Sequence, residues 1–491
     1  MMNMSFGEWL PDQPDNASGV TVAKNVIPAA KGYRGLQDLS AYSNAASGRI
    51  RGLFAAKDSS GDPKIFAGDA SQLYEFTKSN SNLTNISKSG NYTTLDDTDV
   101  WKFIDFSGFV IGASGHNNIL QVYDNGTSSL FADISGSPAA KHIAVVRDFV
   151  FTGNVKYGGT TYTNRLYWSS LASHTGWTAG TNQSDIQDIF DMGEITGIVG
   201  GEYATILCEK GIVIGTYSGT PLIFQFDKVQ TGFGCNYPNS VANVGSTVFY
   251  LSDDGFYKFD GRTSTPIGAE KVNRFFFDDF TIRNKGRMST AVDPTEQIVV
   301  WSYTSGSSNN DEPDRLLIYN YALDRWSYAE LDCELISSFM TINYTLEELN
   351  FISTSLDGLP ASLDSAIYNG GQFIFGGAKD KKIHTFSGNN KAALIETADL
   401  DTGGGKTSII TNVIPYVEIA QGTTPDISAQ VSTRNRQVDS DSFGNLSSLN
   451  ANGYCNIRSN QGRYHKIRLN VSGTWKYIQG VEIEAKTTGR R

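Results

Sequence analysis

Residues 65–76, with the sequence IFAGDASQLYEF, hold two short apolar runs on either side of a polar turn. The first run, IFAG, contains β-branched and aromatic residues and ends in glycine. The second, LYEF, would place its side chains alternately on the two faces of a strand and carries aromatic rings. β-Branched and aromatic residues favour strands, whereas Gly, Asp and Ser favour turns. The stretch therefore predicts two neighbouring antiparallel strands.

The same pair of runs recurs along the chain. The further copies are 109–112 with 120–123, 149–153 with 165–168, 212–215 with 222–226, 248–251 with 255–259, 298–301 with 316–321, and 373–376 with 382–386. Closely spaced copies are 44, 41 and 36 residues apart, measured from Gly68 to Gly112, from Gly112 to Gly153 and from Gly215 to Leu251. This period is typical of propeller blades, each a four-stranded antiparallel sheet whose middle strands would be the two runs.

We therefore expect an all-β chain built on a β-propeller. Seven paired runs predict seven blades. The range is six to eight, because two of the steps, 62 and 75 residues long, are too long for one blade. The competing interpretation is an array of unrelated β-sandwiches, which would also show short strands and frequent turns.

The pattern divides the chain into three expected parts. Residues 1–47 contain Pro11, Pro14, Pro28 and several glycines, and they predict an extended N-terminal arm. Residues 48–388 carry the paired runs and predict the propeller. Residues 389–491 follow with longer alternating runs, which predict a C-terminal β-sandwich of half-buried antiparallel strands.

Charge is unevenly spread over the chain. The net charge is −11, with ten basic against four acidic residues (+6) in residues 431–491 and −17 in the rest. A protein that grips nucleic acid through its overall charge is basic, so this class is excluded. The +6 segment predicts either the solvated side of half-buried strands or a docking patch for an acidic neighbour.

No motif points to catalysis or to a metal. The GGGKT sequence at 403–407 lacks the first glycine of a phosphate-binding loop, and we interpret it as a linker. Asp439, Asp441 and Gly444 match only part of a calcium loop, which favours a polar turn. None of the five histidines pairs with another at metal-ligand spacing: His116, His142, His174, His384 and His465. We therefore expect no catalytic, cofactor-binding or metal-binding residues and no cofactor.

The N-terminal sequence predicts no secretory signal, and no apolar run is long enough for a membrane-spanning helix. The four cysteines are too few and too scattered for a disulfide framework or a zinc knuckle. We expect them to be buried free thiols: Cys208, Cys235, Cys333 and Cys455.

The two ends of the chain resemble one known family. The stretches are FGEWLPDQPDN…GVTVAKNVIPAAKGYRGLQDLS at the start and GRYHKIRLNVSGTWKYIQGVEIEAKTTGRR at the end, and residues 49–76 resemble that family's first blade. The family is the tail nozzle proteins of short-tailed double-stranded DNA phages, which include tail tubular protein B and the packaged-DNA stabilisation protein. The matching residues are structural rather than catalytic: Trp9, Pro11, Asn25, Pro28, Gly32, Tyr33, Arg463, Tyr464, His465, Gln479, Gly480, Arg490 and Arg491.

The resemblance implies a structural virion protein made in the host cytoplasm. It implies a homohexameric ring below the portal adaptor ring, which retains packaged DNA, passes it during ejection without sequence-specific binding, and contacts tail fibres or a tail needle. It implies neither catalysis nor a cofactor. The chain is too short for the large insertions of the longest nozzles, so a fibre-docking tip is not implied.

Two expectations concern the ring. The arm at 1–47 has few means of folding alone, so we expect it to wrap a neighbouring subunit, and loss of residues 1–40 to abolish the hexamer. DNA must slide through a conduit, so we expect the acidic body of the chain to line it, because a ring of lysines would hold phosphates.

Two alternatives remain open. A carbohydrate-binding propeller, acting in receptor recognition, would stack sugars on exposed aromatic residues such as Trp168 and Trp177. A sialidase-like glycoside hydrolase is the less favoured alternative, because neighbouring acids such as Asp278 and Asp279 would point to opposite faces of a strand.

Overall fold

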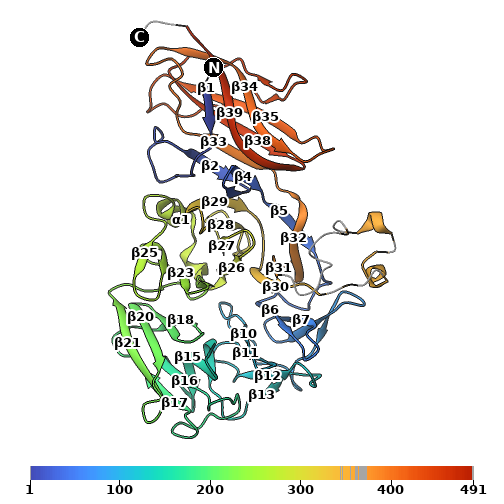
Figure 1. The fold of residues 1–491 in the computed structure, drawn as a ribbon, viewed down its shortest axis with the longest axis vertical. Coiled ribbons are helices and arrows are strands. Elements are labelled where there is room, and N and C mark those ends of the chain that lie inside the picture. The colour runs from blue at the N-terminus through green and yellow to red at the C-terminus, as the bar shows by residue number, and fades with distance from the viewer. Residues whose placement is uncertain are drawn as a thin grey trace.

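The computed structural model describes residues 2–342, 344, 347–353, 355–359, 363 and 373–488. Small antiparallel sheets surround a common axis, and a second domain extends from their rim (Figure 1). The N- and C-terminal ends lie in that second domain. The chain is thus a β-propeller with a C-terminal β-sandwich, as the paired runs and the alternating C-terminal runs predict.

In the part of the chain that the structure describes, the propeller has seven blades of four strands each. Blades one to three are β6 (Gly52–Lys57), β7 (Pro63–Gly68), β8 (Leu73–Thr77) and β9 (Asn82–Asn85); β10 (Lys102–Phe106), β11 (Phe109–Ala113), β12 (Gln121–Asp124) and β13 (Ala132–Asp133); and β14 (Ala139–Val146), β15 (Phe149–Tyr157), β16 (Thr160–Trp168) and β17 (Asp185–Asp188).

Blades four to six follow in chain order, and blade seven takes one strand from elsewhere. They are β18 (Ile195–Val199), β19 (Ala204–Cys208), β20 (Gly211–Tyr217) and β21 (Phe224–Thr231); β22 (Ala242–Val244), β23 (Thr247–Ser252), β24 (Gly255–Phe259) and β25 (Ser264–Pro266); β26 (Ser289–Asp293), β27 (Ile298–Tyr303), β28 (Arg315–Asn320) and β29 (Arg325–Glu330); and β30 (Leu335–Met340), β31 (Phe373–Lys379), β32 (Lys382–Asn390) and β5 (Gln37–Ala41).

Six of the seven predicted pairs are the second and third strands of their blades, and these strands are largely buried. The fourth pair is wrong by one strand, because residues 212–215 and 222–226 fall in β20 and β21, the third and fourth strands. The second strand of that blade, β19, has the sequence ATILC and is as buried as the others, but it does not close on glycine. The next strand, β20, contains IVIG, a run that closes on glycine, so the pattern was matched one strand late and the apparent step became longer.

The propeller ring is closed by a strand from the N-terminal arm. β5 pairs with β32 antiparallel, with His384 opposite Ala41 and Phe386 opposite Leu39. This blade takes its outer strand from the N-terminal segment and its inner strands from the far end of the propeller sequence. The arrangement closes the ring, because the first and last blades cannot separate without breaking the hydrogen bonds between β5 and β32. The first strand of this blade is β30, which lies within the 75-residue step of the sequence pattern.

The rest of the arm is built into the sandwich. β1 (Met2–Ser5) and β4 (Gly32–Gly35) both pair with β39 (Trp475–Thr487), and β3 (Val26–Ala29) pairs with β4. Residues 1–47 therefore do not form a separate arm that waits for a partner. We expected this segment to wrap a neighbouring subunit because it has few means of folding alone. That reason is wrong, because the described strands of the segment pair with strands of their own chain.

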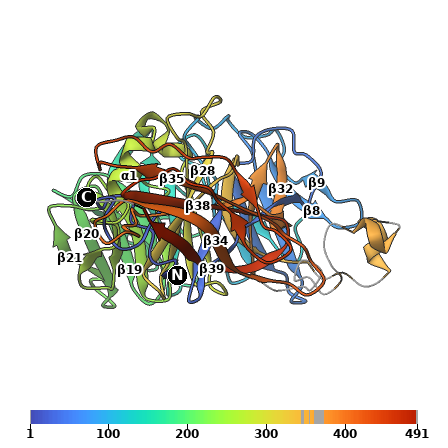
Figure 2. The same ribbon diagram turned by 90° about the horizontal axis from the view of Figure 1, so that it is seen from above.

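The sandwich consists of two sheets (Figure 2). One sheet has the order β3-β4-β39-β34-β37, with β34 at Ser408–Ile419 and β37 at Cys455–Asn456. The other runs β2-β33-β38-β35-β36 and comprises β2 (Val20–Lys24), β33 (Ala393–Thr397), β38 (Tyr464–Ser472), β35 (Asp426–Arg434) and β36 (Ser447–Ser448). The predicted domain at 389–491 is thus completed by strands from the other end of the chain.

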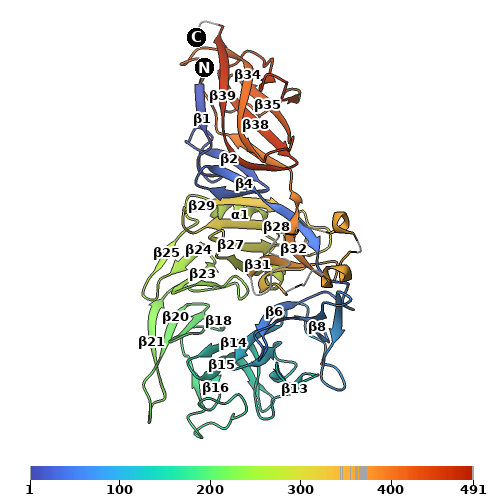
Figure 3. The same ribbon diagram turned by 45° about the vertical axis from the view of Figure 1, so that its right-hand side comes forward.

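The two domains share one sheet and one core. β2 also pairs with β29 of blade six, in parallel, with Lys24 opposite Tyr328, so a nine-stranded sheet runs from blade six into the sandwich (Figure 3). One cluster of buried apolar side chains includes Trp326 of the propeller, Trp9 of the arm and Val481 of the sandwich. The junction is therefore packed as a protein interior and not as a flexible link.

Helices are few. The described residues include the short helix α1 (Asn273–Asp279) and the 3₁₀ turns η1 (Ile282–Arg287), η2 (Glu348–Phe351) and η3 (Leu356–Gly358). Within the described residues, no helix has the length and apolar character needed to cross a membrane. The four cysteines are free and buried, as predicted.

Candidate functional site

The first strand of each blade lines the central channel of the propeller. First strands of neighbouring blades contact each other around the axis, as β6 does β10 and β10 does β14. The channel holds a cavity of about 770 Å³, and residues of all seven first strands line it. Aromatic and aliphatic side chains such as Phe54, Phe103 and Ile198 make much of its wall.

Lys102 and His142 form a polar pair in this channel wall. Lys102 begins β10, and His142 lies in the neighbouring first strand, β14. The Lys102 Nζ atom is 3.0 Å from His142 Nδ1. Burial lowers the pKa of Lys102 to about 8, and burial together with the charge of Lys102 holds the pKa of His142 well below its usual value. At neutral pH the histidine is therefore a neutral imidazole that accepts from the lysine ammonium.

A second cavity opens beside this pair. It has a volume of about 360 Å³ and is bounded by the loops that precede the first strands of blades two, four, five and six. Lys102 and His142 line both cavities. Across the second cavity Lys141 lies 3.7 Å from the buried carboxylate of Asp99, whose pKa is raised by burial. The pair therefore stands where the channel meets one face of the propeller.

The family-matching residues of the arm lie at the junction of the two domains. Trp9 is fully buried, its Nε1 donates to the Thr21 carbonyl at 3.1 Å, and its ring stacks on Tyr328 with centroids 5.1 Å apart. Phe275 of α1 packs edge-on against the same ring at 4.9 Å. Pro11 lies in the next turn, beside the cleft above α1. These positions fix the arm to the propeller.

Pro28, Gly32 and Tyr33 fix the arm to the sandwich. Pro28 is buried and pairs with Tyr33 across the β3–β4 hairpin. Tyr33 is 1% exposed and its hydroxyl donates to the Gly7 carbonyl at 2.9 Å. Gly32 has φ +106°, and a Cβ placed there would lie 2.4 Å from the carbonyl oxygen of Ile478. Only glycine fits where β4 crosses so close to β39.

Replacing Gly32 by alanine is expected to lower the free energy of unfolding by about 2–4 kcal/mol. The left-handed backbone costs about 1–2 kcal/mol for alanine, and overpacking against a backbone oxygen costs about 1–3 kcal/mol. Gly422→Ala is the matched control, because Gly422 also has positive φ but faces open space. Urea unfolding should show the larger loss for Gly32→Ala, and equal losses would mean that β4 does not need this close approach.

At the other end of the chain, the matching residues also serve the sandwich. The side chain of His465 is buried and lies between Ser408 Oγ at 3.0 Å and Thr433 Oγ1 at 3.2 Å. Gly480 lies under β1, where a Cβ would meet the Met4 carbonyl at 2.2 Å. The neighbouring Gln479 carbonyl accepts from Phe6 N at 2.9 Å.

The remaining matching residues of this end are peripheral. Arg463 is exposed, and its guanidinium lies 5.8 Å from the ring centroid of half-buried Tyr464. Arg490 and Arg491 lie outside the described residues. The structure thus gathers most of the matching residues into one sandwich, and none of those that it describes lines the propeller channel.

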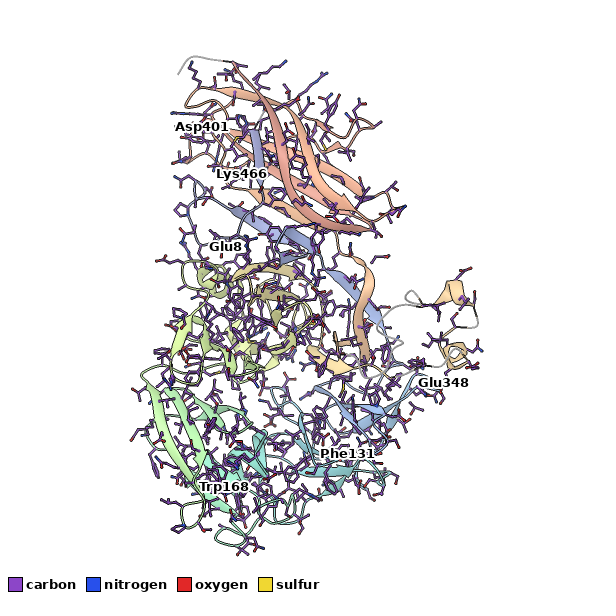
Figure 4. All side chains as sticks on the ribbon, in the orientation of Figure 1. Glu8, Phe131, Trp168, Glu348, Asp401 and Lys466 are labelled. Carbon is purple, nitrogen blue, oxygen red and sulfur yellow. The ribbon has the colours of Figure 1, made fainter. Side chains whose placement is uncertain are left out.

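Much of the basic C-terminal segment faces carboxylates of its own chain. Arg434, 6% exposed in its side chain, bonds to Asp399 and lies 3.0 Å from Asp15 of the arm. Lys466 lies 3.1 Å from Asp15 and 2.8 Å from Asp441, and Figure 4 shows it within the sandwich. Burial acts to raise the pKa of Asp15, but hydrogen bonds from Arg434 and Lys466 outweigh it and lower that pKa.

This cluster weakens the docking hypothesis for the +6 segment. Arg468 is likewise paired, at 2.6 Å from Glu396. Arg434 and Lys466 are buried in ion pairs, so they belong neither to a solvated strand face nor to an open docking patch, whereas Arg458 and Lys476 are exposed, as expected for a solvated strand face. The calcium-loop residues Asp439 and Asp441 belong to the same set of ion pairs, with Arg436 and Lys466 as partners.

The aromatic residues expected to stack on sugars are buried. Trp168 and Trp177 are each 3% exposed. Trp168 donates to the Gln183 carbonyl at 2.8 Å and stacks on Phe151, while Trp177 donates to the His174 carbonyl at 2.7 Å. The expectation of exposed rings is wrong, because the long loop after β16 folds over blade three and buries them. The carbohydrate alternative thus loses the observation on which it rested.

Sequence reasoning missed the pair Lys102–His142. The two residues are on different blades, and neither belongs to the paired runs that mark the middle strands. The available signal was their position: each lies in the strand before a matched pair, where a propeller places its channel-lining strand. Among the described residues, no group of three or more His, Cys, Asp or Glu side chains is arranged to hold a metal ion.

No family model matches the chain, and no curated protein matches it. Among solved structures, the extracellular domain of a putative hybrid two-component system from B. thetaiotaomicron is similar, with a TM-score of 0.41 and 12% identity over 86% of this chain and 48% of that one. A WD40 domain from Neurospora crassa has a TM-score of 0.35 and 7% identity over 60% of this chain and 86% of that one. The chain spans about half the length of the first structure. These distant similarities say nothing about what this chain does.

Proposed function

We propose that the chain is a structural subunit of the tail nozzle of a short-tailed double-stranded DNA phage. Six copies form a ring below the portal adaptor, hold the packaged genome in place and let it pass during ejection. The ring also meets tail fibres or a tail needle. No catalytic step and no cofactor are part of this proposal.

One observation carries the proposal. The two stretches that resemble nozzle proteins lie at opposite ends of the sequence, yet Tyr33 pairs with Ile478 in one sheet and the Phe6 N–H donates to the Gln479 carbonyl. The residues matched at the two ends thus serve one structural unit, as expected if the resemblance reflects a shared domain. A chance likeness of two separate segments would not require them to meet.

Exposed apolar side chains support assembly of a closed ring. Phe190, at 63% exposure, and Leu222, at 69%, flank β17 and β21 at the outer edges of blades three and four. Leu356 in η3 and Phe373 at the start of β31 are 67% and 59% exposed. β21 lies at one edge of the propeller in Figure 1, and Glu348 of the neighbouring turn η2 lies at the opposite edge in Figure 4. A ring with head-to-tail contacts joins two such different patches of neighbouring subunits.

Native mass spectrometry of the purified chain, alone and mixed with a portal–adaptor complex, tests the proposal. We expect a species of six copies, and we expect Phe190→Asp/Leu222→Asp to shift it toward single copies without changing the melting temperature. Val438→Asp is the matched control, because Val438 is 87% exposed on the sandwich. A chain that stays a single copy under both conditions contradicts the proposal.

The conduit is expected to be lined by the acidic body of the chain. The chain has a net charge of −17 outside residues 431–491. An acidic lining does not bind DNA phosphates by displacing their counterions, as a basic lining would. DNA can then slide without being held. The loss of residues 1–40 no longer tests ring assembly, because it removes strands β1 to β4 and most of β5 from the fold itself.

A further inference from the structure

The cavity beside Lys102 and His142 contains a cation without a counter-charge. Lys102 forms no ion pair with any described carboxylate, and its only close polar partner is the neutral imidazole of His142. A buried or half-buried ammonium is normally paired, because desolvation of an unpaired charge is costly. The missing partner points to an anion from outside the chain.

The histidine has a second polar group that lacks a hydrogen-bond partner. Because Nδ1 accepts from the Lys102 ammonium, the ring proton lies on Nε2. His142 is 3% exposed, and Nε2 forms no hydrogen bond of normal geometry with a described residue, although the Ile195 backbone interacts with the ring. A buried N–H without a partner is uncommon in folded proteins. An anion beside Lys102 would give both groups an acceptor.

We propose that Lys102 and His142 bind a small oxyanion, either a free one or the carboxylate or phosphate group of a small ligand, at the mouth of the propeller channel. The ammonium of Lys102 supplies the charge, and Nε2–H of His142 supplies a directed hydrogen bond. The 360 Å³ cavity holds the anionic group, and the apolar side chains in the channel behind it, such as Phe103 and Ile198, can receive an uncharged portion of the ligand.

The surrounding charges do not fill this role. Lys141 is engaged with Asp99 at 3.7 Å, and Glu209 accepts from the Glu194 backbone N–H at 3.2 Å. Arg283 is bonded to Asp311, which leaves Lys285 as an exposed cation at the rim. The other titratable groups around the pair are Arg51 and Asp105 at the channel, Glu194 at the second cavity, His116 next to Asp99, and the buried thiol of Cys235.

The pH dependence of binding follows from the state of Lys102. Below pH 8 the lysine is charged and ready to bind an anion. Above that pH the free protein has lost the proton and must take it up again, so the affinity falls by about tenfold per pH unit. His142 stays neutral throughout this range because its pKa is far lower. Arginine in place of Lys102 would stay charged and remove this dependence.

Sulfate is a suitable probe because it does not titrate between pH 6.5 and 9.5. Calorimetric titration of the full chain should give saturable binding that is constant below pH 7.5 and weakens above pH 8. Lys102→Met should weaken binding by at least about tenfold, the scale of losing one charge-assisted hydrogen bond. Lys102→Arg should bind with no pH dependence. The matched control, Lys476→Met, changes an exposed lysine of the sandwich and should bind as the wild type does.

Benzoate and benzamide distinguish the two sources of the anion. Tighter binding of benzoate than of sulfate indicates a carboxylate ligand with an apolar body, and the reverse order indicates a free oxyanion. Either order supports the site. Three results would overturn it: no saturable binding of sulfate or benzoate to the wild type, equal binding to Lys102→Met, or binding of neutral benzamide as tight as that of benzoate.

Discussion

Replacing Trp9 by alanine is expected to lower the free energy of unfolding of the isolated chain by about 3–5 kcal/mol, the range for truncating a buried tryptophan. Its ring is fully buried between Tyr328 of blade six and Phe275 of α1, and its Nε1 donates to the Thr21 carbonyl. Alanine would leave a cavity at the point where the arm, the propeller and the sandwich meet.

The measurement is urea unfolding followed by circular dichroism and intrinsic fluorescence. Val438→Ala is the control, because Val438 is also apolar but 87% exposed on the sandwich, and its loss should change stability by less than about 0.5 kcal/mol. If Trp9→Ala unfolds at the wild-type urea concentration, the arm is not part of the subunit's own core. The original expectation of an arm that waits for a neighbouring subunit would then be restored.

The second large effect is expected at Arg434. Replacing it by methionine should cost about 3–5 kcal/mol, because removing one partner of a buried ion pair leaves the other charge uncompensated. The stranded partner is Asp399, whose side chain is only 2% exposed and whose Oδ1 already has no hydrogen-bond partner. The change also releases Asp15, which ties the arm to the sandwich.

Arg436→Met is the matched control, because Arg436 is two residues away and 77% exposed in its side chain. A double variant, Arg434→Met with Asp399→Leu, should recover part of the lost stability, because it removes the stranded carboxylate as well. If the double variant has a lower free energy of unfolding than Arg434→Met, the cluster does not act through charge compensation.

The middle strands of the blades could be predicted because their pattern is local. β7 and β8 are short, apolar and separated by four residues, so neighbouring side chains carry the whole signal. The same reasoning failed for blade four, where the run that closes on glycine, IVIG, lies in β20 and not in β19. The buried positions of Trp168 and Trp177 were missed because they depend on how a long loop folds, and local sequence does not determine that.

The closing strand and the anion site depend on contacts between distant residues. β5 has the polar sequence QDLSA and becomes a strand through β32, which lies at the far end of the propeller sequence. Lys102 and His142 each look like an ordinary polar residue of a strand. They can be recognised as one site only once β10 and β14 are known to lie side by side in the channel wall. Propeller geometry supplies that neighbourhood, and the sequence pattern of either strand alone does not.

The central proposal is that the chain forms a ring through which DNA passes. Electron microscopy of the full chain, alone and bound to a portal–adaptor complex, tests this most directly. We predict six-fold rings with a central hole, with one propeller and one sandwich in each of six repeating units. Single particles of one propeller and one sandwich in both samples, or a ring whose hole is lined mainly by arginine and lysine, would contradict it.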